Sequence, residues 1–111
     1  MLDVSLHELA GVRSGDKGDL SNIGVIAYDA RDYPLLLREL TTERVRTFFG
    51  PLVKGRVERY ELPKLAALNF LLHEALDGGG TVSLRVDAQG KTFGAALLGM
   101  EIDLDEPRNQ P

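Results

Sequence analysis

The residues of this chain whose types could do chemistry gather in one polar segment, residues 14–22, with the sequence SGDKGDLSN. Two glycines, Gly15 and Gly18, can adopt positive φ angles, so successive backbone N–H groups can converge into an anion-binding nest. Lys17 adds a flexible positive charge that suits a phosphate or a carboxylate. Taken alone, the segment favours a solvated connection between two strands, and an anion-binding loop is the alternative hypothesis.

Residues on either side of this segment could complete such a site. Arg13 could neutralise Asp16 and Asp19, whose negative charges oppose anion binding, and Asn22 could fix a polar group of the ligand. Asn69 interrupts a row of leucines, and a buried amide needs a partner because leaving it unpaired costs ~1–3 kcal/mol. A structural clamp is favoured for Asn69, with a pocket-lining role as the alternative. The predicted ligand-binding residues are Arg13, Ser14, Gly15, Lys17, Gly18, Asn22 and Asn69.

Several familiar motifs are excluded by spacing. No serine or threonine follows Lys17, so the segment is not a Walker phosphate loop, and two glycines three positions apart do not make the dinucleotide-binding pattern. Asp16 and Asp19 alone supply too few ligands for a tight Mg²⁺ or Ca²⁺ site. We therefore predict no metal and no cofactor.

Catalytic groups are sparse. His7 and His73 are the only histidines, and nothing in their spacing brings them together. A histidine at the border of an apolar face is usually packed and hydrogen-bonded. A triad built on Ser14 or Ser21 lacks the nucleophile elbow that would expose the serine. The sequence assigns no catalytic residue, and it leaves open whether the protein is an enzyme.

Length and composition limit the class of protein. The 111 residues fit one domain, expected over residues 1–104, with a disordered polar tail over 105–111. The net charge of -4 and the absence of a basic stripe argue against nucleic acid as a partner. No apolar run is long enough to span a membrane. The absence of cysteine and of a signal peptide at the N-terminus favours the cytoplasm.

Periodicity predicts alternating strands and helices. We expect strands at residues 4–12, 22–29, 55–62 and 81–87, the second central and covered on both faces, the third at an edge. We expect two short helices within residues 32–50 and a last helix at 91–102. The clearest helix is expected at residues 63–77, with an apolar stripe of Leu65, Leu68, Leu72 and Leu76. The predicted fold is an α+β sandwich with a mixed sheet of four or five strands and helices mainly on one face.

Three quoted stretches resemble a known family. RSGDKGDLSNIGVIA, YPLLLRELTTERVR and VERYELPKLAALNFLLHEALDGGGTVSLRVDAQGKTFGAALLGMEI are similar, in this order, to the C-terminal domain of the acyclic terpene utilisation (AtuA-like) proteins. The likeness runs from about residue 6 to residue 102. It implies a ferredoxin-like α/β sandwich and a place in the bacterial breakdown of branched, terpene-derived acids as coenzyme A thioesters. It carries over no catalytic residue.

Larger members of that family carry a much larger domain before this one. We therefore expect this chain to act alone, as a homo-oligomer or beside a larger partner chain, and the last two are favoured. Two hypotheses follow: an accessory domain that binds protein, or a domain that binds an acyl-CoA or another anion through residues 14–22. A pocket converging on Lys17, Asn22 and Asn69 would favour ligand binding, and a broad apolar patch would favour protein docking.

Overall fold

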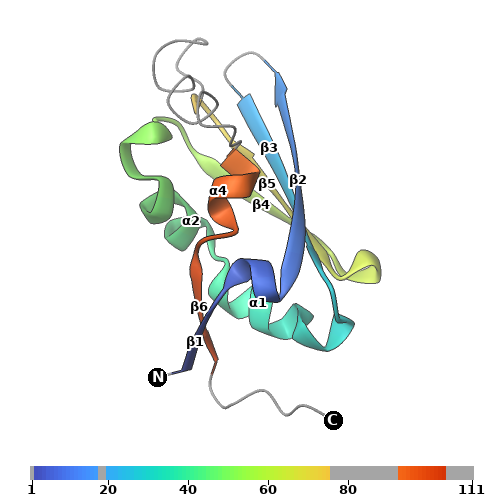
Figure 1. The fold of residues 1–111 in the computed structure, drawn as a ribbon. Helices are drawn as coiled ribbons and strands as arrows, with labels where there is room; N and C mark the ends of the chain where they lie inside the picture. Colours follow the sequence, from blue (N-terminus) through green and yellow to red (C-terminus); the bar gives the residue numbers. More distant parts are fainter. Residues whose placement is uncertain (1, 18–19, 76–92, 105–111) are drawn as a thin grey trace.

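A computed structural model of the chain describes residues 2–17, 20–75 and 93–104, and Figure 1 shows its fold. A ribbon of two antiparallel strands joins β1 (Leu2–Ser5) to β6 (Glu101–Leu104). A four-stranded sheet has the order β2-β3-β5-β4. Its strands are β2 (Ala10–Lys17), β3 (Leu20–Ala27), β5 (Ala67–Leu72) and β4 (Val57–Leu62). The predicted α+β class is confirmed, but each pair of described strands is antiparallel, where a mixed sheet was expected.

The predicted helix pair is confirmed. Helix α1 (Tyr33–Glu39) has Pro34 in its first turn, where the missing N–H removes no helical bond. Helix α2 (Thr42–Phe49) begins at Thr41, whose side chain accepts the Arg44 N–H at 3.1 Å. It ends at Gly50, whose φ of 58° suits glycine. The expected last helix is shorter than predicted, since α4 covers only Phe93–Leu97 and β6 follows it.

All three of these helices pack on the same face of the four-stranded sheet, as Figure 1 shows. Alternate residues of β3 and β5 point into this layer, as the period of two of a strand requires. The core joins these strands to α1, α2 and α4 through Ile23, Val25, Leu68, Phe70, Leu72, Leu36, Val45, Phe49 and Leu97.

The helix predicted at residues 63–77 is wrong. The short 3-10 turn η4 (Pro63–Leu65) leads into strand β5, which lies between β3 and β4. Leu68 and Leu72 are fully buried, as expected, because they are four residues apart and so share a strand face. Leu65 is 66% exposed, so the expected leucine stripe does not exist as one surface. The predicted stripe's last member, Leu76, lies outside the described residues.

The strand predicted at residues 4–12 is two strands. The 3-10 turn η1 (Leu6–Glu8) separates them, because the N–H groups of Leu6 and His7 donate to the carbonyls of Met100 and Leu98. This pairing turns the chain from the β1–β6 ribbon into the main sheet. The prediction that residues 55–62 form an edge strand is confirmed, since β4 ends the described sheet.

The segment 14–22 links two neighbouring strands, as predicted, but most of it is not a loop. Strand β2 extends to Lys17 and β3 begins at Leu20, with Gly15 opposite Asn22 and Lys17 opposite Leu20. Strand β3 is central, as predicted, but the described elements cover only one of its faces, and Asn22 and Ile26 of the other face are exposed. The strand expected at 81–87 and the tail at 105–111 lie outside the described residues. Within the described ranges, no helix is long and apolar enough to cross a membrane.

Candidate functional site

The face of the four-stranded sheet that the helices leave uncovered is the candidate functional site, called here the open face. Strand register assigns its residues, because directly opposite residues of paired strands share a face. They form three cross-strand rows, each written from β2 to β4: Gly11–Ile26–Ala67–Leu62, Arg13–Gly24–Asn69–Tyr60 and Gly15–Asn22–Leu71–Glu58.

Apolar side chains are concentrated on the open face and its border. Among the described residues, six large hydrophobic side chains are exposed, and five of them lie here. These are Ile26, Tyr28, Tyr60, Leu62 and Leu65. The ring of Tyr28 lies over Gly11, where a Cβ atom would be 3.5 Å from it. Scattered single hydrophobic residues are normal on a surface, but a group on one sheet face marks an interaction surface.

A polar row crosses the middle of this face. Arg13 on β2 and Asn69 on β5 flank Gly24, and a Cβ atom on Gly24 would be 3.8 Å from the Asn69 Oδ1 atom. Within the described part of the chain, no hydrogen bond is made by the side chain of Arg13, Asn69 or the neighbouring Asn22. Asn69 is therefore not the buried clamp that was favoured from the sequence. These three polar groups remain able to bind an external partner.

Glu58 organises the β4 side of the open face. Its carboxylate accepts hydrogen bonds from Arg56 Nε at 2.9 Å and from the Tyr60 hydroxyl at 3.1 Å, and it lies 3.2 Å from the His73 Nε2 atom. The Arg56 bond, followed by those of His73 and Tyr60, lowers the pKa of Glu58 to about 2. The same Glu58 bond raises the pKa of Tyr60. The prediction that His73 is a hydrogen-bonded residue is confirmed.

The structure divides the predicted ligand-binding residues between the two faces. Arg13, Gly15, Asn22 and Asn69 share the open face. Ser14 lies on the helix side, where its Oγ atom accepts the N–H of Gly94 at 2.9 Å and attaches α4 to β2. The Lys17 side chain and Gly18 lie outside the described parts of the structure.

The serines considered as nucleophiles are poorly placed for that role. Ser21 is fully buried on the helix side, and Ser14 holds α4. No group of three His, Asp or Glu residues among those described is arranged to hold a metal ion. Sequence reasoning missed Tyr60 and Glu58 as site residues, although the parity of Tyr60 and Leu62 in the charged strand placed those two on one face.

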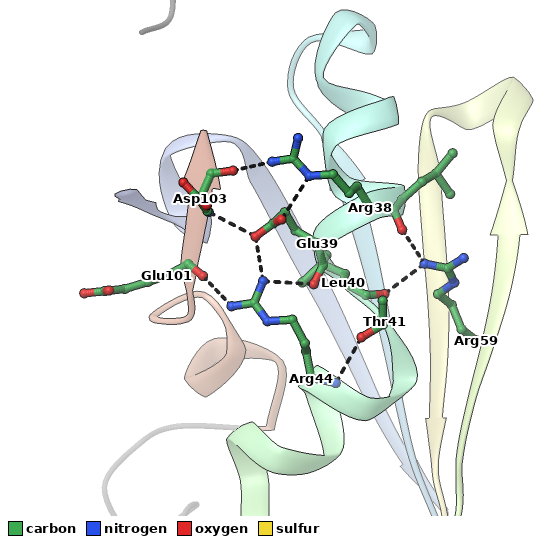
Figure 2. Close-up of polar contacts among 9 residues, drawn as sticks. Arg38, Glu39, Leu40, Thr41, Arg44, Arg59, Glu101 and Asp103 are labelled. Carbon is green, nitrogen blue, oxygen red and sulfur yellow. Dashed lines mark hydrogen bonds and ion pairs between the residues drawn. The ribbon is translucent and has the colours of Figure 1, made fainter. Parts of the chain in front are cut away.

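A second polar cluster connects α1, α2 and β6, and Figure 2 shows it. Glu39 Oε1 accepts from Arg44 Nη1 at 2.6 Å and from the Asp103 N–H at 3.0 Å, while its Oε2 accepts from Arg38 at 3.0 Å. Burial raises the pKa of Glu39, but the Asp103 N–H and the two guanidinium groups outweigh it, so the pKa lies below its usual value. Arg44 also donates to the Glu101 carbonyl at 3.0 Å.

Arg59 extends this cluster to the main sheet, because its Nη1 atom donates to the carbonyls of Leu37 and Leu40 at 2.8 and 3.0 Å (Figure 2). The charges of the cluster are thus bonded to one another and to helix-end carbonyls. We assign it a structural role: it holds the α1–α2 connection against both sheets.

The sequence places this fold in a family. Residues 4–103 match the AtuA ferredoxin-like domain, and the chain belongs to that family. The ferredoxin-like α/β sandwich expected from the resemblance is therefore confirmed. No curated protein and no solved structure matches the chain.

Proposed function

We propose that this protein is a non-catalytic accessory domain that docks its open face on another protein surface. The observation that carries the proposal is the concentration of Ile26, Tyr28, Tyr60 and Leu62 on a sheet face that no described helix covers. Burying such side chains releases about 25 cal/mol for each Å² of apolar surface, so a partner would gain stability from covering them.

The family provides the context of this proposal. Membership in the AtuA ferredoxin-like domain family supports a role in bacterial acyclic-terpene or branched acyl-CoA breakdown, beside a second copy or a larger partner chain. In this role the domain would position or stabilise a catalytic chain and need no reactive group of its own. The cytoplasmic location stays a prediction.

Cysteine reactivity tests the docking proposal, because the natural sequence contains no cysteine. Asn22→Cys places one thiol on the open face. Glu43→Cys places a control thiol at a likewise exposed position of α2, on the helix side of the molecule. In an extract of the source cells, we expect maleimide to label Asn22→Cys several-fold more slowly than Glu43→Cys, and equally fast after denaturation. Equal rates in the native extract would contradict docking through this face.

Ligand binding is the second candidate function, and the grouping of Arg13, Asn22 and Asn69 favours it. An arginine beside two amides suits a carboxylate or phosphate. We propose titration calorimetry with CoA, a branched acyl-CoA and a free branched acid. Binding that falls in both Arg13→Ala and Lys17→Ala would support the predicted site. Binding unchanged in both variants, or no heat at millimolar ligand, would contradict it.

A further inference from the structure

The size pattern of the open face points to what covers it. All three glycines of this face, Gly11, Gly15 and Gly24, lie in the β2–β3 half, while the β4–β5 half has none. The β2–β3 half therefore has more small positions than the β4–β5 half. This unequal distribution is best matched when the β2–β3 half of one copy meets the β4–β5 half of another.

This inference rests on the proposed docking function and names the occupant. We propose that the open face is covered by a second copy of this chain, packed face to face about a two-fold axis parallel to the strands and midway between β3 and β5. Such an axis exchanges the edges of the sheet, so β2 of one copy lies over β4 of the other. Aligned sheets pack about 10 Å apart, with the side chains of the two faces interdigitated.

The strand register gives the contacts that this axis would create. Within each cross-strand row, the residue on β2 meets the residue on β4, and the residue on β3 meets the residue on β5. A larger residue then meets a smaller one in four of the six pairs. These are Leu62 with Gly11, Ile26 with Ala67, Asn69 with Gly24, and Glu58 with Gly15; the other two are Asn22 with Leu71 and Arg13 with Tyr60. The ring of Tyr28 over Gly11 would pack against Leu62.

Charge complementarity favours the same arrangement. Arg13 is the one side chain that β2 presents between Gly11 and Gly15, and the axis places it over Tyr60 and within reach of Glu58 of the second copy. A guanidinium over a tyrosine ring gains cation–π attraction, and Glu58 adds a negative charge. Arg56 binds Glu58 from the side away from Tyr60. Each contact occurs twice, as an isologous interface requires.

The other face-to-face axis, perpendicular to the strands, fits poorly. It would place β2 over β2 and β4 over β4, so glycines would meet glycines and Arg13 would meet its own copy. Like charges brought together across an interface are unfavourable. Size and charge therefore select the axis parallel to the strands.

Sedimentation velocity on the full chain tests the proposal through charge reversal. We expect the wild type to sediment at about twice its 12.2 kDa mass, and Arg13→Glu and Glu58→Arg each to dissociate at least about tenfold more readily. An equimolar mixture of the two variants should associate again, because both contacts between positions 13 and 58 then join one acidic and one basic side chain. Glu43→Arg, on exposed α2, should sediment as the wild type does.

Crosslinking gives a readout that does not depend on reversing a bonded charge. Opposite Cα atoms of two sheets packed about 10 Å apart are too distant for a disulfide, so a short bis-maleimide is the probe. Because the chain has no cysteine, mixing Arg13→Cys with Tyr60→Cys and this reagent should yield a mixed covalent dimer, in large excess over mixtures that contain Glu43→Cys. A wild type that stays at 12.2 kDa up to high micromolar concentration would overturn the proposal. So would a dimer that neither Arg13→Glu nor Glu58→Arg weakens.

The outcomes also separate this proposal from the docking function. A monomeric wild type whose Asn22→Cys thiol is nevertheless protected in the cell extract would remove the second copy and keep docking on another partner. A dimer in which the Asn22→Cys thiol reacts freely would place the contact on another surface and contradict both proposals.

Discussion

At the scale of single residues, the groups around Glu58 keep its carboxylate charged at lower pH than an ordinary glutamate. Arg56 first, then His73 and Tyr60, lower its pKa to about 2. A carboxyl group whose pKa is lower in the folded chain stabilises the fold above its unfolded pKa of about 4.3. That contribution is lost as the pH falls from there towards 2.

We therefore expect Glu58→Gln to lower the free energy of unfolding. This loss should be largest at neutral pH and should decrease steadily between about pH 4.3 and pH 2. Urea unfolding at a series of pH values measures it, in the Arg13→Glu background and at low protein concentration, so that association contributes little. A loss that stays constant from pH 7 to pH 3 would contradict this assignment of the charge.

Ser14 and Gly94 make a second residue-scale prediction. A Cβ atom on Gly94 would lie 2.1 Å from Ser14 Oγ, so Gly94→Ala forces the hydroxyl away and breaks its bond to the Gly94 N–H. We expect each of Ser14→Ala and Gly94→Ala to cost about 0.5–1.5 kcal/mol, and the double variant to cost less than their sum. Chemical denaturation of the three variants measures the coupling. Additive losses would show that the two residues do not act together.

The segment around Ser14 shows what the sequence could not predict. Gly15, Asp16, Gly18 and Asp19 are turn-forming types, so the segment looked like one loop with one site. It is mostly paired strand, and strand alternation sends Arg13 and Ser14 to opposite faces. Arg13, Asn22 and Asn69 share one face of the sheet, whereas Ser14 lies on the other. Their division between faces follows from register, which the types alone do not specify.

At the scale of elements, Leu68 and Leu65 form a matched pair. A helix at residues 63–77 would have buried both, whereas strand β5 buries Leu68 and leaves Leu65 on η4, 66% exposed. We expect Leu68→Ala to cost about 2–5 kcal/mol and Leu65→Ala to change the free energy of unfolding by about 0.5 kcal/mol or less. Urea denaturation at low protein concentration checks both. Equal losses of unfolding free energy in the two variants would support the helix predicted at residues 63–77 and contradict strand β5.

Strand β5 could not be recognised from the sequence because it lacks the two patterns that usually mark a strand, namely alternation of apolar and polar residues and glycine at the flanking turns. The open face places Leu71 between the buried Phe70 and Leu72, so the alternation of apolar and polar residues disappears. Residues in the left-handed region lie just before and just after the strand, Ala66 with φ 51° and Glu74 with φ 52°. Glycine usually marks such turns, and neither position has it. By contrast, α1 and α2 carried their ordinary proline, threonine and glycine signals and were predicted correctly.

The Glu39 cluster makes an element-scale prediction as well. Glu39 binds Arg38, Arg44 and the Asp103 N–H, and its side chain is 12% exposed. Glu39→Ala removes the carboxylate that accepts these bonds and leaves the Asp103 N–H without this acceptor, so we expect a loss of about 1.5–3 kcal/mol in the free energy of unfolding. Glu43→Ala, exposed on α2, should change it by about 0.5 kcal/mol or less. Similar losses in the two variants would show that the cluster adds nothing to the fold.

At the scale of the whole molecule, association should make thermal stability depend on concentration. A partner that binds only the folded chain raises its melting temperature by mass action. We expect the wild-type melting temperature to rise by about 3–5 °C for each tenfold increase in protein concentration. The melting temperature of Arg13→Glu should be lower than that of the wild type at each concentration within the range where the wild type is associated, because fewer of its chains are paired. Scanning calorimetry checks this, and a wild-type melting temperature independent of concentration would contradict association.

The class of the whole molecule was more predictable than its surface. Strands mixed with helices were enough for the α+β class, and the helices lie on one face as expected. The open face was not predicted, because β3 was expected to be covered on both sides. Ile26 and Tyr60 are buried or exposed according to whether a helix packs on their face of the sheet. The helix expected at residues 63–77 could have covered a face, but these residues form η4 and strand β5 of the sheet instead.

The ribbon of β1 and β6 has a mechanical consequence. Leu2 lies opposite Leu104, so the two ends of the described fold start from the same end of one antiparallel ladder, as Figure 1 shows. A force that pulls residues 2 and 104 apart loads this ladder one rung at a time, as a zipper opens, and does not shear all its bonds together. The ribbon therefore peels at low force, and the tension then reaches the Arg44 and Arg38 bonds to β6 before it reaches the four-stranded sheet.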